Sequence, residues 1–166
     1  MTTSLSHAIA IELAITLTGG DPTPATTQAD LCALLTEAEA EAILGKPLAA
    51  PEAQPGGDCW YPEQAGAGGG GEIILHVLPV RFDSKEKFHA FLVKETEQLN
   101  ARLKKAMAGT GAEVTETTVE PAPEVAEPAY YVDPSLFVLK GEKVLAIFAD
   151  RAQAVQVAAK ALPRFK

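Results

Sequence analysis

Cysteine and aromatic residues are scarce in this sequence, and long hydrophobic runs are absent. Of its 166 residues, 2 are cysteine, 1 is tryptophan and 6% are aromatic. No stretch approaches the roughly 18 consecutive apolar residues of a membrane-spanning helix, so we expect no transmembrane span. No segment carries a catalytic, metal-binding or cofactor-binding motif. We therefore expect a protein that is not an enzyme and that holds neither a cofactor nor a metal.

Positively charged residues are in the minority. The chain carries 14 Lys and Arg against 22 Asp and Glu, which gives a formal net charge of -8. The basic residues lie mainly between Arg81 and Lys105 and in the C-terminal third, without interleaved aromatic residues, so we expect no nucleic-acid partner. With 47% apolar residues, 13 Gly and 12 Pro, the composition is typical of one globular domain with long loops.

The two cysteines predict a disulfide. Cys32 and Cys59 lie on either side of a stretch rich in Pro and Gly, in neither a metal-ligand spacing nor a Cys-x-x-Cys motif. A bond between them would restrain the unfolded chain by roughly 3 to 4 kcal/mol. The alternative is a pair of reduced, buried cysteines, as in a cytosolic protein. A catalytic thiol is disfavoured, because the sequence does not place His7, His76 or His89 to activate either sulfur.

Residues 8–18 form an apolar run for which three interpretations are open. As a secretion signal, segment 1–20 has a suitable apolar core, but it lacks a basic start and includes Glu12. As a short helix, the run would begin near Ser6 and end at Gly19. As a strand, it would place five aliphatic side chains on one face. These side chains are Ile9, Ile11, Leu13, Ile15 and Leu17.

The strand interpretation bears on assembly. Such a strand could join the sheet of its own domain, or it could add to the edge of a neighbouring chain and so form a homo-oligomer. Residues 21–29 are rich in Pro and Thr and predict a flexible tether. Residues 30–166 are then expected to form a single α+β domain.

Three helices are predicted in this domain. Thr36 and Glu39 form a capping-box pattern for a helix over 37–44. The longest helix extends from 85 to about 107, and the last from 151 to about 162. The predicted N-caps are Thr36, Ser84 and Asp150. The longest helix carries an apolar stripe, of which we expect Phe88, Phe91, Leu92 and Leu99 to face the sheet and to be largely buried. This stripe consists of Phe88, Phe91, Leu92, Leu99, Leu103 and Met107.

Six segments have strand patterns. They are 59–61, 72–80, an edge strand within 114–119, 130–132, 136–139 and 143–148. Residues 46–58 are expected to be a loop, and Lys140-Gly141-Glu142 a tight hairpin. The element order is helix, strand, strand, helix, strands, helix. The expected fold class is α+β, with a largely antiparallel sheet packed by helices.

Few residues are candidates for chemistry. His76 alternates with apolar residues and is expected to pack in a strand, His89 is expected at the surface, and Asp83 is an isolated carboxylate. A pocket in which either histidine meets a carboxylate would instead favour an enzyme. The carboxylates of 112–128 lack the spacing of a calcium loop. The glycines of 66–71 lack the Lys and the following helix of a phosphate loop.

Part of the chain resembles a known group of proteins. Asp30-Leu31-Cys32-Ala33-Leu34-Leu35-Thr36, with the helix after it and Cys59-Trp60-Tyr61, resembles bacterial envelope lipoproteins of unknown function. Leu17-Thr18-Gly19-Gly20 is similar to the end of their lipobox, Leu-x-Gly-Cys, but Gly20 replaces the lipidated cysteine and forbids lipidation there. From Gly66 onward, the order of elements is similar to the α/β sandwich of PsbP and Mog1-like domains.

These resemblances imply a location and a mode of action. The lipoprotein-like part implies the cell envelope or exterior, reached by soluble export or by attachment through a partner, with binding or assembly in place of catalysis. The sandwich order implies no activity. We therefore expect a non-enzymatic secreted or cell-envelope domain that binds a protein or surface component. The alternatives are a subunit of an extracellular assembly joined by N-terminal strand addition, and a small-ligand-binding or enzymatic domain without a recognisable motif.

Overall fold

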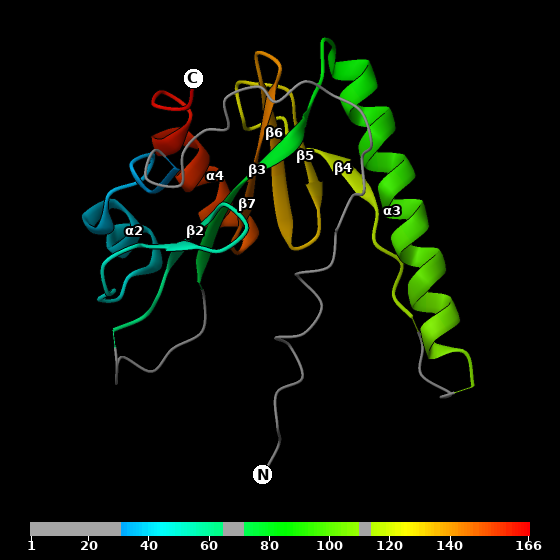
Figure 1. Cartoon of the computed structure of the whole chain (residues 1–166), viewed down its shortest axis with the longest axis horizontal. Helices are drawn as coiled ribbons and strands as arrows, with labels where there is room; N and C mark the ends of the chain where they lie inside the picture. Colours follow the sequence, from blue (N-terminus) through cyan, green and yellow to red (C-terminus); the bar gives the residue numbers. More distant parts are fainter. Residues whose placement is uncertain (1–30, 65–71, 110–113) are drawn as a thin grey trace.

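The computed structural model describes residues 31–64, 72–109 and 114–166, and its fold is α+β as the sequence predicts. Within these residues, seven strands form one antiparallel sheet in the order β1-β2-β3-β7-β6-β5-β4. Helices α2 and α4 pack on one side of the sheet, and α3 lies on the other (Figure 1). The predicted class, a largely antiparallel sheet packed by helices, is confirmed.

Several sequence predictions fall on residues outside this description. The first is the signal-like or strand segment 1–20, with its aliphatic residues Ile9, Ile11, Leu13, Ile15 and Leu17. The others are the Pro/Thr-rich tether 21–29 and the glycines of 66–71. They stay predictions.

The strands form in the expected order, with one addition. In chain order they are β1 (Glu52–Gln54), β2 (Asp58–Tyr61), β3 (Ile73–Arg81), β4 (Val119–Pro121), β5 (Ala129–Val132), β6 (Ser135–Lys140) and β7 (Lys143–Phe148). The sequence predicts a loop where β1 lies, because residues 52–54 have little β propensity. Pairing with β2, from Glu52 opposite Trp60 to Gln54 opposite Asp58, makes this segment a strand.

The β6–β7 hairpin agrees with the sequence prediction, whereas the start of β4 differs from it. The predicted hairpin between β6 and β7 is confirmed, with Gly141 at a φ of 61° between the paired Lys140 and Lys143. The edge strand β4 (Val119–Pro121) shares only Val119 with the predicted segment 114–119. The reason is Asn100 of the long helix, whose side chain accepts from the Thr117 N–H at 3.0 Å and donates to the Thr117 carbonyl at 2.8 Å. These bonds hold the segment before β4 on the helix.

The three helices match their predicted positions within one residue. α2 (Glu37–Leu44) has the full capping box of Thr36 and Glu39, and it ends at Gly45 with a φ of 68°. α3 (Lys85–Met107) begins at Ser84, whose hydroxyl accepts from the Lys87 N–H at 3.3 Å. α4 (Arg151–Ala161) differs in its cap, because the side chain of Asp150 makes no capping hydrogen bond.

The apolar stripe of α3 is only partly buried, which corrects the sequence prediction. Of the four residues expected to be buried, Phe88 and Leu92 are buried, whereas Phe91 and Leu99 are half-buried. Further along the stripe, Leu103 is half-buried and Met107 is 36% exposed. The helix lies over β4 and β5 with its N-terminal half, and its C-terminal half extends beyond the sheet (Figure 1). Helical periodicity therefore identified the stripe correctly but overestimated how much sheet lies beneath it.

A charged pair joins the C-terminal end of the chain to α2. Arg164 donates from both terminal nitrogens to the Glu39 carboxylate, at 2.6 and 2.9 Å, and also to the Leu34 carbonyl at 3.0 Å. The Thr36 N–H donates to the same carboxylate at 2.9 Å. The bonds from Arg164 and then Thr36 lower the pKa of Glu39 from 4.5 to about 2.

We expect Glu39→Gln to lower the free energy of unfolding at neutral pH and to have little effect near pH 2. Glutamine keeps the capping box but removes the charge. Because folding lowers the pKa of Glu39, its contribution is present above about pH 4.5 and is lost as the pH falls toward about 2. Thermal melts of both proteins across this range measure the difference. A difference that does not shrink on acidification would contradict the ion pair.

Candidate functional site

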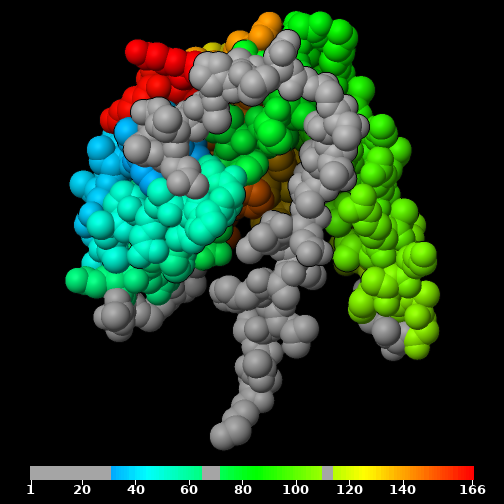
Figure 2. Space-filling view, in the orientation of Figure 1, coloured from blue at the N-terminus to red at the C-terminus, as the bar shows by residue number. Residues whose placement is uncertain are grey.

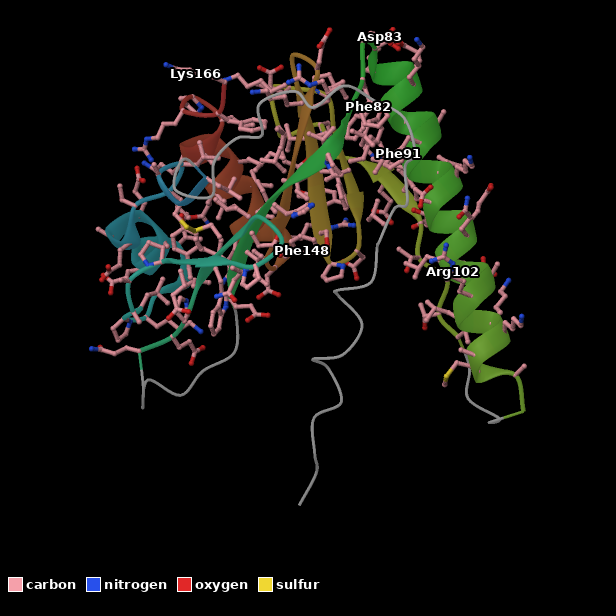
Figure 3. The ribbon with its side chains drawn as sticks, in the orientation of Figure 1. Phe82, Asp83, Phe91, Arg102, Phe148 and Lys166 are labelled. Carbon is pink, nitrogen blue, oxygen red and sulfur yellow. A yellow bond between two sulfur atoms is a disulfide. The ribbon has the colours of Figure 1, made fainter. Side chains whose placement is uncertain are left out.

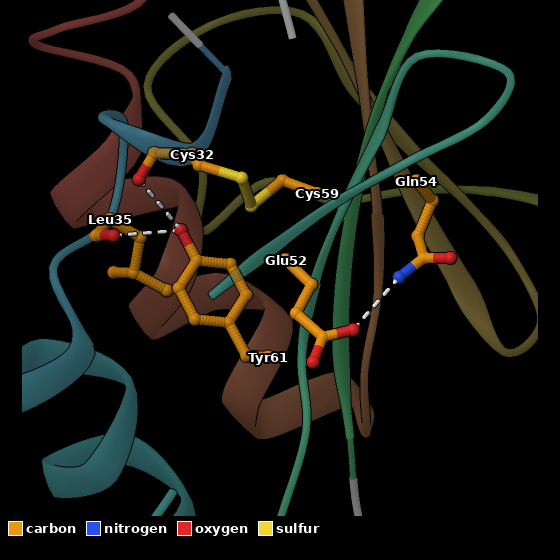
Figure 4. Close-up of a disulfide and its surroundings, with 6 residues drawn as sticks. All are labelled: Cys32, Leu35, Glu52, Gln54, Cys59 and Tyr61. Atoms are coloured by element: carbon orange, nitrogen blue, oxygen red, sulfur yellow. Dashed lines mark hydrogen bonds between the residues drawn. A yellow bond between two sulfur atoms is a disulfide. The ribbon is translucent and has the colours of Figure 1, made fainter. Parts of the chain in front are cut away.

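The predicted disulfide between Cys32 and Cys59 is present and fixes β2 against the start of the described chain. The two Cα atoms are 5.2 Å apart, and Cys59 is fully buried. Beside the bond, the Tyr61 hydroxyl donates to the Leu35 carbonyl at 2.7 Å and lies 3.3 Å from the Cys32 carbonyl (Figure 4). Burial raises the pKa of Tyr61 well above its usual value. Cys59 and Tyr61 have a structural role, because both are buried in the core beneath α2 and α4.

On the opposite side of the sheet, strand pairing lines up two adjacent rows of side chains. Directly paired residues of an antiparallel sheet point to the same face. The first row is Trp60, Ile74, Phe148, Ser135 and Val132, across β2, β3, β7, β6 and β5. The second row is Asp58, His76, Ala146, Phe137 and Tyr130, in the same strand order.

Most of the large side chains in these rows are half-exposed, and together they form a surface that we call the open face. It consists of Trp60, Ile74, His76, Val132, Phe137 and Phe148. Ser135 and Ala146 lie buried among them. Neighbouring apolar side chains that stay partly exposed on one surface are typical of an interaction site.

Helix α3 covers only one part of this side of the sheet. Phe82, Phe88 and Phe91 pack together where β3 leads into the helix, with ring centroids 5.4 and 5.1 Å from that of Phe82. Phe148 lies on the central strand β7, toward the opposite end of the strands from Phe82, and Arg102 lies on the part of α3 that extends beyond the sheet (Figure 3). Figure 2 shows orange sheet atoms between the cyan β1–β2 region and green α3.

The polar groups of the open face are paired with each other. The Nδ1 atom of His76 contacts the Oδ1 atom of Asp58 on the neighbouring strand, and both side chains are about one third exposed, at 30% and 35%. The indole N–H of Trp60 donates to the Glu72 carboxylate at 3.2 Å. His76 thus contacts a carboxylate, which is the arrangement that would favour an enzyme if it lay in a pocket. Here the pair lies on the surface of the sheet.

The other candidate residues do not join His76. His89 is exposed on α3 and stacks on Tyr130, with ring centroids 4.8 Å apart. Asp83 forms an ion pair with Lys87 at 2.7 Å, and the hydrogen bond from Lys87 lowers its pKa. No hydroxyl or thiol contacts His76 by hydrogen bonding among the described residues, where both sulfurs are in the disulfide. The arrangement can hold and orient an imidazole, but it supplies no nucleophile.

The described residues form shallow depressions away from the open face. Two shallow depressions border α2, one beside Lys46 and Pro47 and one toward Gln156 and Lys160 of α4. Within 31–64, 72–109 and 114–166, no three His, Cys, Asp or Glu side chains gather as a metal site would require. In the same part of the chain, no helix combines the length and hydropathy of a membrane span.

Sequence reasoning missed the aromatic members of the open face. It placed Trp60 on a short strand and Phe137 and Phe148 within strands, without a role for any of them. The available signal was that β3 and β7 are apolar at nearly every position, so both faces of the sheet need cover.

Comparison of the chain with models of protein families, with characterised proteins and with solved structures found no significant match. The resemblances to envelope lipoproteins and to PsbP and Mog1-like domains therefore stay predictions.

Proposed function

We propose that this chain is a non-enzymatic, extracytoplasmic domain that binds a protein partner through the open face of its sheet. The observation that carries the proposal is the pair of adjacent rows in which Trp60, Phe137 and Phe148 stay partly exposed. Tryptophan and other aromatic residues are enriched at the centres of protein interfaces. A partner that presents apolar side chains, with polar groups for the His76–Asp58 pair, fits this surface.

The disulfide supports a location outside the cytoplasm. Disulfides form and persist in oxidising compartments and are rare in the cytosol. The Cys32–Cys59 bond fastens β2, which carries Trp60 on the open face and Cys59 on the buried face. Loss of the bond in a reducing compartment would therefore loosen the strand at one end of the proposed binding surface.

The open face is a better candidate for binding than the edges of the sheet. The two edge strands, β1 and β4, have three residues each, and β4 ends at Pro121. Short edges and edge prolines give an added strand few backbone groups to pair with. Assembly by strand addition to these edges is therefore the less favoured function.

Cross-linking from the open face tests the proposal. A photoreactive phenylalanine analogue replaces Phe137 on the open face or, as the control, Gln156 on the exposed surface of α4. We expect one predominant cross-linked protein from position 137 and none of that protein from position 156. The cross-linked protein, once purified, should bind the unmodified chain. Equal cross-linking from both positions, or no binding between the purified proteins, would overturn the proposal.

A further inference from the structure

We infer that the aliphatic side of residues 9–17 docks on the open face of its own chain. The open face lies on the side of the sheet that α2 and α4 do not cover, and its members Trp60 and Ile74 lie outside the apolar cluster that contains Phe88 and Leu92 of α3. Residues 9–17 precede Leu31, the first described residue, in the same chain. A protein partner would then have to displace this segment, a consequence that rests on the proposed function.

The two surfaces have complementary chemistry. Residues 9–17 alternate, so that an extended backbone would present Ile and Leu on one side and Ala, Glu and Thr on the other. The open face presents aromatic and aliphatic side chains that stay half-exposed, among them Ile74, Phe137 and Phe148. When such a segment packs on the sheet, its apolar side contacts the open face and its polar side faces the solvent.

Docking through the Ile and Leu side chains of residues 9–17 leaves no isolated charge in the contact. The one charged residue in 9–17 is Glu12, and it falls on the side opposite the Ile and Leu side chains. The ionisable groups beside the open face are His76 and Asp58, which pair with each other, and Glu72, which accepts a hydrogen bond from the Trp60 indole. Burying apolar side chains beside a paired group avoids the large penalty of an unpaired buried charge.

Residues 21–29 are long enough to let residues 9–17 reach the open face. Leu31 belongs to the core under α2 and α4, and Cys32 is tied to β2, one strand from the β1 edge of the sheet. Passing around β1 to the other face means crossing about 5 Å per strand and roughly 10 Å of side-chain layer. Nine residues, 21–29, span up to about 30 Å when extended.

The tether also favours the segment's own chain over a second copy. A short tether gives the attached segment an effective concentration in the millimolar range. A second copy of the chain competes only at its own bulk concentration, which is far lower in dilute solution. The occupant of the open face is therefore the segment that precedes it in the same chain.

Trp60 reports on this contact, because it lies on the open face and is the one tryptophan of the sequence. The experiment compares the full chain with a variant that lacks residues 1–20, at several protein concentrations. It also compares two double variants of equal charge, Ile11→Asp with Leu13→Asp on the aliphatic side and Ala10→Asp with Ala14→Asp on the other. Far-ultraviolet circular dichroism checks that each variant keeps the fold.

We expect removal of 1–20 to shift Trp60 emission to longer wavelength and to increase its quenching by acrylamide. The Ile11/Leu13 variant should give the same shift, and the Ala10/Ala14 variant should match the full chain. Unchanged emission on deletion, or equal shifts from both double variants, would overturn the inference. Emission that depends on protein concentration, together with an oligomer in light scattering, would also overturn it in favour of exchange between chains.

These outcomes are separate from those of the proposed function. The Trp60 measurement contains no partner, so it decides whether 9–17 docks, whatever binds elsewhere. Cross-linking at Phe137 in the variant without 1–20 decides whether a partner binds an uncovered face. If both proposals hold, the purified partner binds this variant more tightly than it binds the full chain, because no segment has to be displaced.

Discussion

Replacing Phe88 by alanine is expected to lower the free energy of unfolding by about 3 to 5 kcal/mol. Phe88 is fully buried between α3 and the sheet, with ring centroids 5.4 Å from Phe82 and 5.6 Å from Tyr130. Its removal leaves a cavity at the contact that attaches α3 to the sheet. Chemical denaturation of the variant and the parent protein measures the loss.

Phe91→Ala is the matched control for this prediction. Phe91 is one turn further along α3, belongs to the same predicted stripe and is only half-buried. Its replacement should therefore cost clearly less than that of Phe88. Equal losses from the two variants would mean that α3 packs along its whole stripe, as the sequence alone suggests, and would contradict the partial attachment of the helix.

Loss of the disulfide is expected to have an effect of similar size. With a sequence separation of 27, the bond between Cys32 and Cys59 restrains the unfolded chain by about 3.5 kcal/mol in the chain-entropy model. Cys59→Ala should therefore lower the melting temperature under oxidising conditions. In the presence of a reductant the parent protein loses the same restraint, so the difference should become small.

A count of free thiols gives an independent check on the bond. Unfolding the protein without a reductant should release no reactive thiol, because both cysteines are in the bond. Two reactive thiols would contradict the disulfide in the isolated protein and would also remove its support for an extracytoplasmic location.

The sequence predicted elements well where the signal was local. The capping box of Thr36 and Glu39, the cap at Ser84 and the turn at Gly141 each depend on residues a few positions apart, and each formed as expected. Strand β1 and the start of β4 were wrong because they depend on distant partners. β1 exists through pairing with β2, and Asn100 holds Thr117 away from the sheet.

The candidate site was less predictable than the fold. The sequence identified the disulfide and singled out His76, but it could not pair His76 with Asp58, because that contact depends on the register between β2 and β3. The exposure of Phe148 depends on where α3 leaves the sheet, which periodicity within the helix does not determine. An open face is a property of the whole assembly of elements, so only the fold reveals it.

The affinity of the purified cross-linked partner for open-face variants tests the central claim most directly. The measurement compares Val132→Ser on the open face with Val155→Ser, a half-buried valine of α4 on the other side of the sheet. Both substitutions remove the same apolar surface. We predict that Val132→Ser weakens binding and that Val155→Ser leaves the affinity unchanged. Equal effects of the two substitutions, or an effect of Val155→Ser alone, would contradict binding through the open face.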